Sequence, residues 1–386
     1  MKIVEMFSGC GGLAYGLSAS GLKPVAMVEA DGAANRTLEA NKTAGVTFAA
    51  DWPITHSDVR RVDWRKHLGN VRVVAGGPPC QPFSQAGKGL GDRDLRDMWP
   101  EAVRAVREIR PEGFLFENVR GLLRPVFESY VEALLATLSK CDPVHGYAVD
   151  RVMVDAADFG APQRRQRVIV AGFRTDIASS VVFPEPTHSR ERLLWDQWVT
   201  GEYWEQHGID KPGEGSIPRA DKGMVDRLLK LRNLGREPKT SRWRTVRDAL
   251  ADLGEPNGEN QHDFQPGARV YAGHTGSMWD QPAKALKAGM HGVPGGENML
   301  RLDDGRVRYF TVREMARLHG FPDEFVFPGN RTQNTRQLGN AVPVALAQAF
   351  ASWMRDALET KGASMLRDSS GLEEEPELPL YKDAAE

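Results

Sequence analysis

The chain has 386 residues, a formal net charge of −2, and hydrophobic and charged fractions of 41% and 26%. These values are typical of a soluble globular protein that is long enough for two domains. Three cysteines, with no CxxC pair and no cysteine–histidine cluster, argue against a disulfide framework and a structural zinc site, so we expect no metal. No apolar stretch reaches signal-peptide or membrane-span length without charges, glycine or proline, which predicts a cytoplasmic protein in a reducing compartment.

The charge is distributed unevenly along the chain. Residues 363–386 carry seven acidic and two basic residues, a net charge of −5, and this acidic tail is expected to be disordered. Residues 211–247 carry eleven basic and four acidic residues, a net charge of +7. The basic segment predicts a phosphate-binding surface, with an ordinary solvated helix face as the alternative.

The N-terminal region has the pattern of a nucleotide-binding fold. Residues 3–7 are predicted to form a strand, the glycine-rich turn 8–12 leads into a helix, and a second strand at 25–28 ends in Glu29. Glycines let the backbone approach a ligand closely, and an acidic residue after the second strand can bind the hydroxyls of a ribose. The pattern indicates an adenosine-containing cofactor. Its spacing departs from GxGxxG, so a dinucleotide-binding oxidoreductase is an alternative at this point.

A candidate nucleophile follows the next predicted strand. The apolar run 71–75 is followed by a turn rich in glycine and proline, residues 76–84, which carries Cys80. At the carboxyl edge of a parallel sheet, a thiol faces the crevice in which α/β proteins bind ligands. A buried structural cysteine is the alternative. The polar, glycine-rich segment 85–97 is predicted to be a mobile loop that closes over a substrate.

Charged residues also accompany two later strands. One helix separates the Cys80 turn from a predicted strand at 114–116, which is followed directly by Glu117. This is the length of a right-handed parallel crossover, so Cys80 and Glu117 are expected on neighbouring strand ends that face one crevice. Arg165 and Arg167 alternate at the start of a further strand and are expected to point to one face, where arginines usually meet an anion or a carboxylate.

The alternation of strands and helices fades after residue 174. Residues 175–306 are richer in glycine, proline, tryptophan and basic side chains, and we predict a second, less regular domain there. Its aromatic side chains are expected in a core rather than as stacking platforms for bases. The remaining predicted elements are a helix at 311–318 that begins with a capping box, a turn at 337–343 and a long helix at 343–358.

Seven motifs follow one another along the chain: Phe7-Ser8-Gly9-Cys10-Gly11-Gly12-Leu13, Glu29, Asp58, Pro78-Pro79-Cys80-Gln81-Pro82-Phe83-Ser84, Glu117-Asn118-Val119, Gln163-x-Arg165-x-Arg167 and Arg336-Gln337-Leu338-Gly339-Asn340-Ala341-Val342-Pro343. In their content and order they resemble the motifs of the cytosine-C5 DNA methyltransferases, and the resemblance spans nearly the whole chain. Pro-Cys-Gln, Glu-Asn-Val and Gln-x-Arg-x-Arg at these separations are highly specific.

The resemblance implies an α/β fold. This fold is the Rossmann-like mixed sheet of S-adenosylmethionine-dependent methyltransferases, flanked by helices, with a smaller irregular target-recognition domain. The last motif packs beside the first in the family, so the catalytic domain is expected to be discontinuous and to comprise residues 1–174 and 307–360. Residues 175–306 would then form the target-recognition domain, and residues 361–386 the acidic tail.

The resemblance also implies a mechanism. The thiolate of Cys80 would add to carbon 6 of cytosine and make carbon 5 nucleophilic, while a protonated Glu117 would assist at ring nitrogen 3, an effect worth roughly 10²–10⁴ in rate. Arg167 would hold the carbonyl oxygen of the base, and Arg165 would orient Glu117 or bind the backbone. The methyl donor would be S-adenosylmethionine, leaving S-adenosylhomocysteine, and its expected contacts are Phe7, Gly9, Gly11, Gly12, Glu29, Asp58, Val59, Pro79, Asn340 and Val342.

This chemistry cannot reach a stacked base, so the resemblance implies that the target cytosine is flipped out of double-stranded DNA. The expected DNA contacts are Gln81, Ser84, Lys88, Arg93, Gln163, Arg242 and Arg244. We expect a monomeric enzyme, of bacterial or phage origin because no regulatory domain precedes Met1, with no membrane partner. It would protect host DNA in a restriction-modification or another anti-phage defence system, beside a cognate nuclease or other defence proteins.

Two alternatives keep the same fold. Transfer-RNA cytosine methyltransferases resemble this chain in the catalytic motifs but carry a Cys-Phe-Thr signature in the recognition region, and no cysteine lies beyond Cys141 here, which favours DNA. A catalytically inactive DNA-binding homologue would be expected to lose Cys80 or Glu117, and both are present. An NAD-linked oxidoreductase would leave the cysteine, glutamate and arginine set unexplained.

Overall fold

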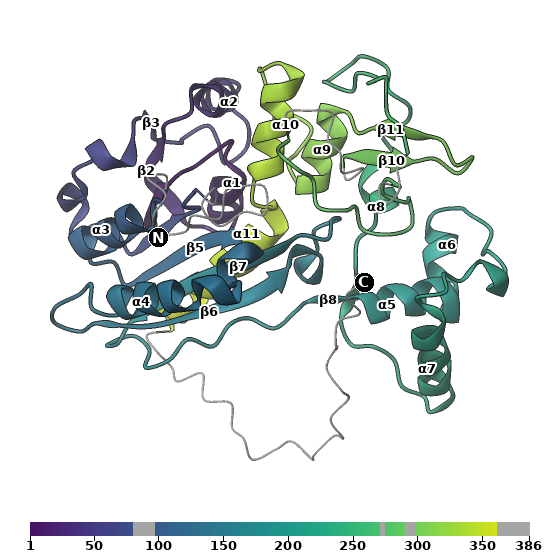
Figure 1. The fold of residues 1–386 in the computed structure, drawn as a ribbon, viewed down its shortest axis with the longest axis horizontal. Coiled ribbons are helices and arrows are strands. Elements are labelled where there is room, and N and C mark those ends of the chain that lie inside the picture. The colour runs from purple at the N-terminus through teal and green to yellow at the C-terminus, as the bar shows by residue number, and fades with distance from the viewer. Residues whose placement is uncertain (80–96, 271–274, 290–297, 361–386) are drawn as a thin grey trace.

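The fold is described from a computed structural model that covers residues 1–79, 97–270, 275–289 and 298–360 (Figure 1). The predicted loop at 85–97, apart from Asp97, and the acidic tail lie outside these ranges. So do Cys80 and four expected DNA contacts, namely Gln81, Ser84, Lys88 and Arg93. Among the described residues, no helix has the length and apolar character needed to cross a bilayer.

A seven-stranded mixed sheet forms the centre of the molecule, in the order β3-β2-β1-β4-β5-β7-β6. The first five strands in this order are parallel, whereas β7 is antiparallel to both β5 and β6. The α/β class and the mixed sheet predicted from the sequence are therefore confirmed. The strands are β1 (Lys2–Met6), β2 (Lys23–Glu29), β3 (Ile54–His56), β4 (Val73–Gly76), β5 (Gly113–Val119), β6 (Tyr147–Asp155) and β7 (Gln166–Arg174).

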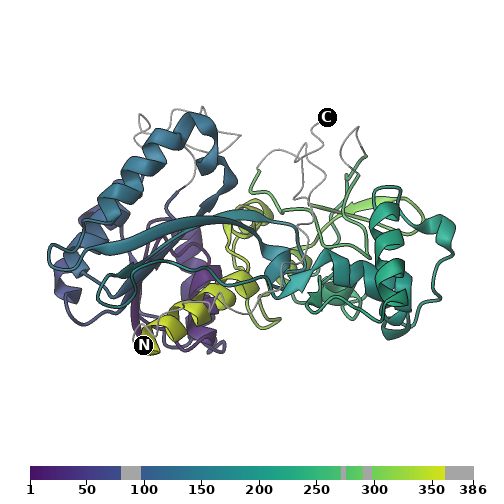
Figure 2. The same ribbon diagram turned by 90° about the horizontal axis from the view of Figure 1, so that it is seen from below.

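Helices cover both faces of this sheet, as Figure 2 shows from its side. Because side chains alternate along a strand, Phe114 and Phe116 of β5 pack in the core with α3 (Trp99–Ile109) and α4 (Glu128–Leu138). Leu115 between them packs in the core on the opposite face, with α1 (Gly12–Ala19) and α11 (Val344–Glu359).

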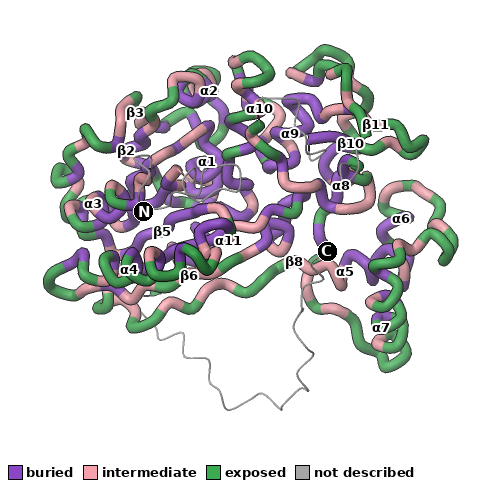
Figure 3. Tube along the Cα trace, in the orientation of Figure 1, coloured by how far each residue is buried: buried purple, intermediate pink, exposed green. Residues whose placement is uncertain are grey.

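The first and the last helices of the described chain lie against each other. A Cβ atom on Gly16 of α1 would come within 2.4 Å of Ala347 Cβ in α11, so only glycine permits this approach. The C-terminal motif is thereby held beside the N-terminal glycine-rich turn. Figure 3 shows the buried residues concentrated along the central strands and α1.

Residues 188–243 form a separate group of helices, which we call the helical lobe. It has two small cores of its own, one around Tyr203 and Trp204 and the other around Leu194 and Val225. Its elements are β8 (His188–Ser189), α5 (Arg190–Leu194), a π-helical turn (Trp195–Thr200), α6 (Glu202–Gln206), α7 (Lys222–Asn233) and β9 (Ser241–Arg242).

The segment after the helical lobe returns to the main body. Apolar residues of α8 and β10 share a core with α9 and with the glycine-rich turn. The domain boundaries at 174/175 and 306/307 stay a prediction. The elements here are α8 (Val246–Leu250), β10 (Met299–Arg301), β11 (Val307–Tyr309), α9 (Val312–His319) and α10 (Arg331–Asn340), and α2 (Gly32–Thr43) belongs to the N-terminal part. In the described residues, 3₁₀ turns occur at Val59–Arg61, Trp64–His67, Arg120–Leu123, Pro125–Phe127, Ala156–Phe159 and Glu214–Ser216.

One predicted element is wrong. Residues 337–340 were expected in a turn, but they are the last residues of α10, and only residues 341–343 form the connection to α11. A capping box begins this helix, because Asn330 accepts a hydrogen bond from the Gln333 amide and the Gln333 side chain accepts one from the Asn330 amide. The capping box predicted at Thr311 and Glu314 is confirmed.

Candidate active site

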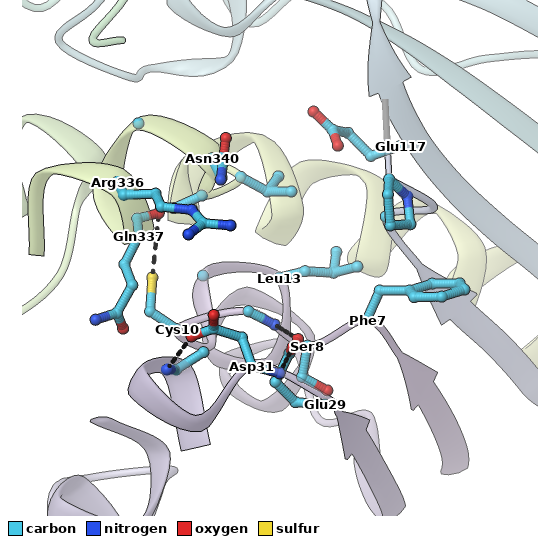
Figure 4. A pocket seen from close by; sticks show the side chains of 18 of the residues that line it. Phe7, Ser8, Cys10, Leu13, Glu29, Asp31, Glu117, Arg336, Gln337 and Asn340 are labelled. Carbon is cyan, nitrogen blue, oxygen red and sulfur yellow. Dashed lines mark hydrogen bonds between the residues drawn. The ribbon is translucent and has the colours of Figure 1, made fainter. Parts of the chain in front are cut away.

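A cavity of about 410 Å³ opens at the carboxyl ends of β1, β2, β4 and β5 (Figure 4). Parallel α/β sheets bind ligands at this edge. The residues that line it come from five places: the glycine-rich turn with the start of α1, the end of β2 with the start of α2, the end of β4, the strands β5 and β7, and α10 with the two residues after it. They are Phe7, Ser8, Gly9, Cys10, Gly12, Leu13, Glu29, Asp31, Ala33, Ala34, Gly77, Pro78, Pro79, Glu117, Asn118, Val119, Arg167, Gln333, Arg336, Gln337, Gly339, Asn340, Ala341 and Val342.

The glycine-rich turn forms one wall. Gly11 has a φ angle of +93°, and a Cβ atom there would lie 2.7 Å from the Trp52 ring, so the turn requires glycine on both counts. A Cβ atom on Gly12 would lie 2.4 Å from the carbonyl oxygen of Val342. Gly12 therefore lets the C-terminal motif close on the turn. Gly11 itself does not line the cavity, although it was expected to contact the cofactor.

Glu29 lies beside this turn with a fixed carboxylate. Its Oε2 accepts a hydrogen bond from the Gly9 amide at 2.7 Å, and its Oε1 accepts one from the Asp31 amide at 2.7 Å. Each oxygen keeps a second lone pair, which suits a carboxylate that also accepts from two neighbouring hydroxyls. Asp31 caps α2 through the amides of Ala33 and Ala34, each at 2.9 Å.

Glu117 and Arg167 face each other on the adjacent strands β5 and β7. The Nε of Arg167 forms an ion pair with Oε1 of Glu117, and the two side chains are only 12% and 11% exposed. Asn118, the residue after Glu117, holds the chain just before Cys80, because its side-chain amide donates a hydrogen bond to the Pro78 carbonyl at 3.1 Å. Pro79, the residue before Cys80, lines the cavity. The glutamate and arginine therefore share one cavity with Glu29 and with the entry to the cysteine turn.

Arg165 does not line the cavity, and its guanidinium binds backbone. It donates to the carbonyl oxygens of Leu286, at 2.9 Å, and Gly339, at 2.6 Å. The residue is 1% exposed. Of the two roles expected for it, orientation of Glu117 or backbone binding, these contacts correspond to the second.

Polar atoms in the cavity wall lack a partner within the described chain. The Ser8 hydroxyl is buried without a hydrogen bond, and so are both amide atoms of the Gln337 side chain. Buried polar groups are almost always hydrogen-bonded, so the Ser8 hydroxyl and the Gln337 amide each require a polar partner outside the described chain. The Glu29 carboxylate, with a free lone pair on each oxygen, fits the ribose of an adenosine-containing ligand.

Two further residues expected at the cofactor do not line the cavity. Asp58 lies at the surface, where a side-chain hydrogen bond from Arg60 lowers the pKa of its carboxyl to about 2. Val59 is 4% exposed and packs in the core against α3. Asp58 and Val59 do not line this cavity, and their expected adenine contacts stay a prediction.

Three expected DNA contacts lie within the described residues. Gln163 is fully buried and donates to the Leu318 carbonyl at 2.8 Å, which corrects the expectation of a surface contact. Arg242 is engaged by Asp248 at 2.6 Å and lies over the Tyr203 ring at 5.1 Å, so its guanidinium is held inside the helical lobe. Arg244 is exposed and remains available to a phosphate.

The sequence interpretation assigned no site role to six polar residues in the cavity wall. Three of them, Gln333, Arg336 and Gln337, lie on α10, and the others are Ser8, Asp31 and Asn118. With Asn340, the α10 residues have the spacing i, i+3, i+4 and i+7, which places them on one helix face. Because residues 337–343 were predicted to form a turn, this helix face was not recognised from the sequence. For Asp31, the available signal was its N-cap position directly after Glu29.

With this geometry in view, comparisons with known proteins give a consistent result. The family described as C-5 cytosine-specific DNA methylase matches residues 1–355. The Type II methyltransferase M.PspPI of Psychrobacter sp. is 32% identical over 90% of this chain and 77% of the relative, and M.NgoMIV of Neisseria gonorrhoeae is 30% identical over 92% and 97%. Among solved structures, a DNMT2 protein of Spodoptera frugiperda aligns with a TM-score of 0.58 and 17% identity, over 92% of this chain and 99% of that one, which shows a shared fold.

Proposed function

The chain belongs to the C-5 cytosine-specific DNA methylases, and from this premise we propose that it methylates carbon 5 of a flipped-out cytosine in a short, specific sequence of double-stranded DNA. The donor is S-adenosylmethionine, and the reaction proceeds through a covalent bond to Cys80. One observation carries the proposal: the Glu117–Arg167 pair lines the same cavity as Glu29, the glycine-rich turn and Pro79. The shared sheet edge of Glu117, Glu29 and Pro79, the residue before the proposed nucleophile, supports this assignment.

The proposed chemistry follows from the electronic character of cytosine. Carbon 5 is too electron-poor to attack a methyl group directly. The Cys80 thiolate therefore adds to carbon 6 while Glu117, whose carboxylate first takes up a proton from solvent, gives that proton to ring nitrogen 3, and the electron pair of the double bond becomes available at carbon 5. When bound, S-adenosylmethionine supplies the methyl group on a positively charged sulfur.

The product is released by reversal of the addition. A base takes the proton from carbon 5, the electrons restore the ring double bond, the Cys80–carbon bond breaks and Glu117 recovers its proton. Arg167 orients Glu117 through the ion pair and offers its remaining N–H groups to the base carbonyl. Arg165 acts as a positioning residue through the two carbonyls that it binds.

Several finer assignments belong to this proposal. Cofactor contacts are assigned to Phe7, Gly9, Gly12, Glu29, Pro79, Asn340 and Val342, all of which line the cavity. Curated relatives carry Type II methyltransferase names, which supports a role in restriction-modification, beside a cognate nuclease. The bacterial sources of these relatives also support a cytoplasmic, DNA-associated enzyme.

Bisulfite sequencing of DNA from cells that express the protein tests the proposal and gives the site. Methylated cytosines in one short sequence are expected, and none in cells that express Cys80→Ala. Duplex DNA that carries 5-fluorocytosine in that sequence should form a covalent adduct in the presence of S-adenosylmethionine, because a fluorine at carbon 5 cannot leave as a proton does. Absence of 5-methylcytosine, or an adduct that persists in Cys80→Ala, would overturn the proposal. Sequencing of RNA from the same cells tests the transfer-RNA alternative.

A further inference from the structure

A buried glutamine accompanies the two arginines at the start of β7. Gln163, Arg165 and Arg167 are two positions apart, and Gln163 forms a parallel bridge with Ala283, so along an extended segment the three side chains point to the same side. Arg167 is paired with Glu117, and Arg165 binds two backbone carbonyls. Gln163 is 0% exposed, and the proposed reaction gives it no part.

The side chain of Gln163 is satisfied at one end only. Its amide nitrogen donates a hydrogen bond to the Leu318 carbonyl at 2.8 Å. Its amide oxygen is buried and has no hydrogen-bond partner among the described residues. Because buried polar atoms are almost always hydrogen-bonded, this oxygen requires a donor from outside the described chain.

His319, the last residue of α9, presents a second acceptor of this kind. Its Nδ1 lies 3.0 Å from the Met315 carbonyl, which can only accept, so Nδ1 carries the ring hydrogen. Burial and, next in size, the charge of Arg165 lower the pKa of His319 to about 3, with a smaller contribution from Arg167. The ring is therefore neutral, and its Nε2 keeps a lone pair. This Nε2 is also buried without a partner in the described chain.

The two acceptors lie at the same end of α9. Leu318, whose carbonyl binds Gln163, directly precedes His319, which is 1% exposed. A metal cation would be repelled by the two guanidinium groups, and a simple anion has no hydrogen to donate. Water fits these requirements, because it has two O–H groups for the two acceptors and a lone pair for an arginine N–H.

We propose that His319 and Gln163 hold one buried water molecule, which accepts a hydrogen bond from the Arg165–Arg167 pair. His319 is then a positioning residue: it does not line the cavity, and it acts through the arginine that orients Glu117. This inference rests on the proposed function, since it adds a residue to the support of the same site. The water site gives the neutral histidine and the glutamine a common role.

Steady-state methyl transfer by the full chain tests the role of His319. His319→Leu removes the acceptor, so kcat should fall roughly tenfold, as for loss of one hydrogen bond to a charged group. The KM for DNA and the Kd for S-adenosylhomocysteine should not change, because His319 lies outside the cavity. His319→Gln returns an acceptor oxygen and should restore most of kcat.

His262→Leu is the matched control. His262 is also 1% exposed and contacts the other end of α9, with Nδ1 at 2.9 Å from the Thr311 hydroxyl and Nε2 at 3.3 Å from the Gly254 carbonyl. Its loss should lower stability in urea and leave kcat unchanged. A merely structural role for His319 predicts the same result for both leucine variants.

A double-mutant cycle tests whether the two acceptors share one water molecule. Gln163→Leu should lower kcat by a factor similar to that of His319→Leu, and the double variant should lower it no further, because loss of either acceptor displaces the same water. Multiplied losses in the double variant would overturn the shared site.

Nitrogen-15 NMR of the histidine-labelled protein gives a readout that needs no catalysis. The His319 signal, identified by its absence in His319→Gln, should show a hydrogen on Nδ1 and no titration from about pH 5 to about pH 8. A hydrogen on Nε2, unchanged kcat in His319→Leu, or a loss that His319→Gln does not recover would overturn this inference alone. If the unaltered protein forms no 5-methylcytosine, the proposed function and the positioning role fail together.

Discussion

The cavity leaves several polar side chains without a hydrogen-bond partner, whereas the helical lobe pairs many of its charged ones. In the cavity, the side chains of Ser8, Gln337 and Arg336 have no partner within the described chain. In the helical lobe, by contrast, arginines are bound to carboxylates of the lobe or of the segment that follows it, and the pairs are Arg190–Asp221, Arg192–Asp196 and Arg242–Asp248. The cavity thus offers its polar groups to a ligand, whereas the helical lobe uses many of its own to hold its small cores together.

This contrast changes the meaning of the basic segment 211–247. Its net charge of +7 counts all basic residues equally, although Arg242 and Arg247 bind the carboxylates of Asp248 and Asp280. Other basic residues of the segment are exposed, and their side chains make no hydrogen bond or ion pair with any described residue; they are Arg219, Lys222, Lys230, Arg236, Lys239 and Arg244. The surface available to a phosphate is therefore smaller than the charge count suggests.

The largest effect that tests this comparison is expected in the cavity. Glu117→Gln keeps the shape of the side chain but removes the proton that ring nitrogen 3 requires, so kcat should fall by roughly 10²–10⁴ with unchanged affinity for S-adenosylhomocysteine. Steady-state methyl transfer and calorimetry measure the two quantities. Glu112→Gln is the matched control, because Glu112 pairs with Arg72 just before the opposite end of β5. Full activity in Glu117→Gln would refute the acid role.

An effect of intermediate size is expected on the free energy of unfolding when the Arg242–Asp248 pair is broken. Burial raises the pKa of Asp248, but the hydrogen bonds from Arg242 and Thr245 outweigh this and hold the pKa at about 2, below its ordinary value of 3.8. Because the pKa is lowered by folding, the stabilisation is present above about pH 4 and is lost as the pH falls from about 4 to 2.

Arg242→Gln should therefore lower the free energy of unfolding by about 1–2 kcal/mol at neutral pH and flatten its decline in acid. Urea denaturation monitored by tryptophan fluorescence measures both, since Trp195, Trp198 and Trp204 lie in the helical lobe. His207 also contacts Asp248, at 3.0 Å, and stays in place in this variant. An unchanged unfolding free energy would show that the Arg242–Asp248 pair does not stabilise the helical lobe.

The smallest effect concerns the exposed arginine. Arg244→Gln should reduce the slope of log K for DNA binding against log salt by about 0.9, the value for one phosphate contact. Fluorescence anisotropy over a salt series measures the slope. Arg242→Gln, two residues away, should leave the slope unchanged, because that guanidinium is already held by Asp248. Equal slopes in the two variants would remove the distinction between engaged and exposed arginines.

The sheet and much of the site could be predicted from the sequence. Apolar runs identified the central strands, and the rule that ligands bind at the carboxyl edge of parallel strands brought Glu29 and Glu117 to one cavity. The capping box at Thr311 was also recognisable, because its two residues are three apart. These features depend on local patterns, which a sequence displays directly.

The parts that were missed have two different causes. Helix α10 has few apolar residues, so no apolar periodicity marks it, and only the capping box of Asn330 and Gln333 signals its start. The burial of Gln163 depends on Leu318, which is 155 positions away. Neither periodicity nor charge reveals such partners.

The buried guanidinium of Arg165 connects two segments that are distant in the sequence. Its guanidinium joins Leu286 to Gly339, and Gly339 lies so close to the chain at Ala288 that a Cβ atom would fall 2.2 Å from that backbone nitrogen. Segment 283–288 is therefore fixed to the residue before Asn340 in the cavity wall. Under the proposed function, a change in this connection on binding of one ligand would make donor binding and DNA binding linked equilibria, in which each ligand changes the affinity for the other by the same factor.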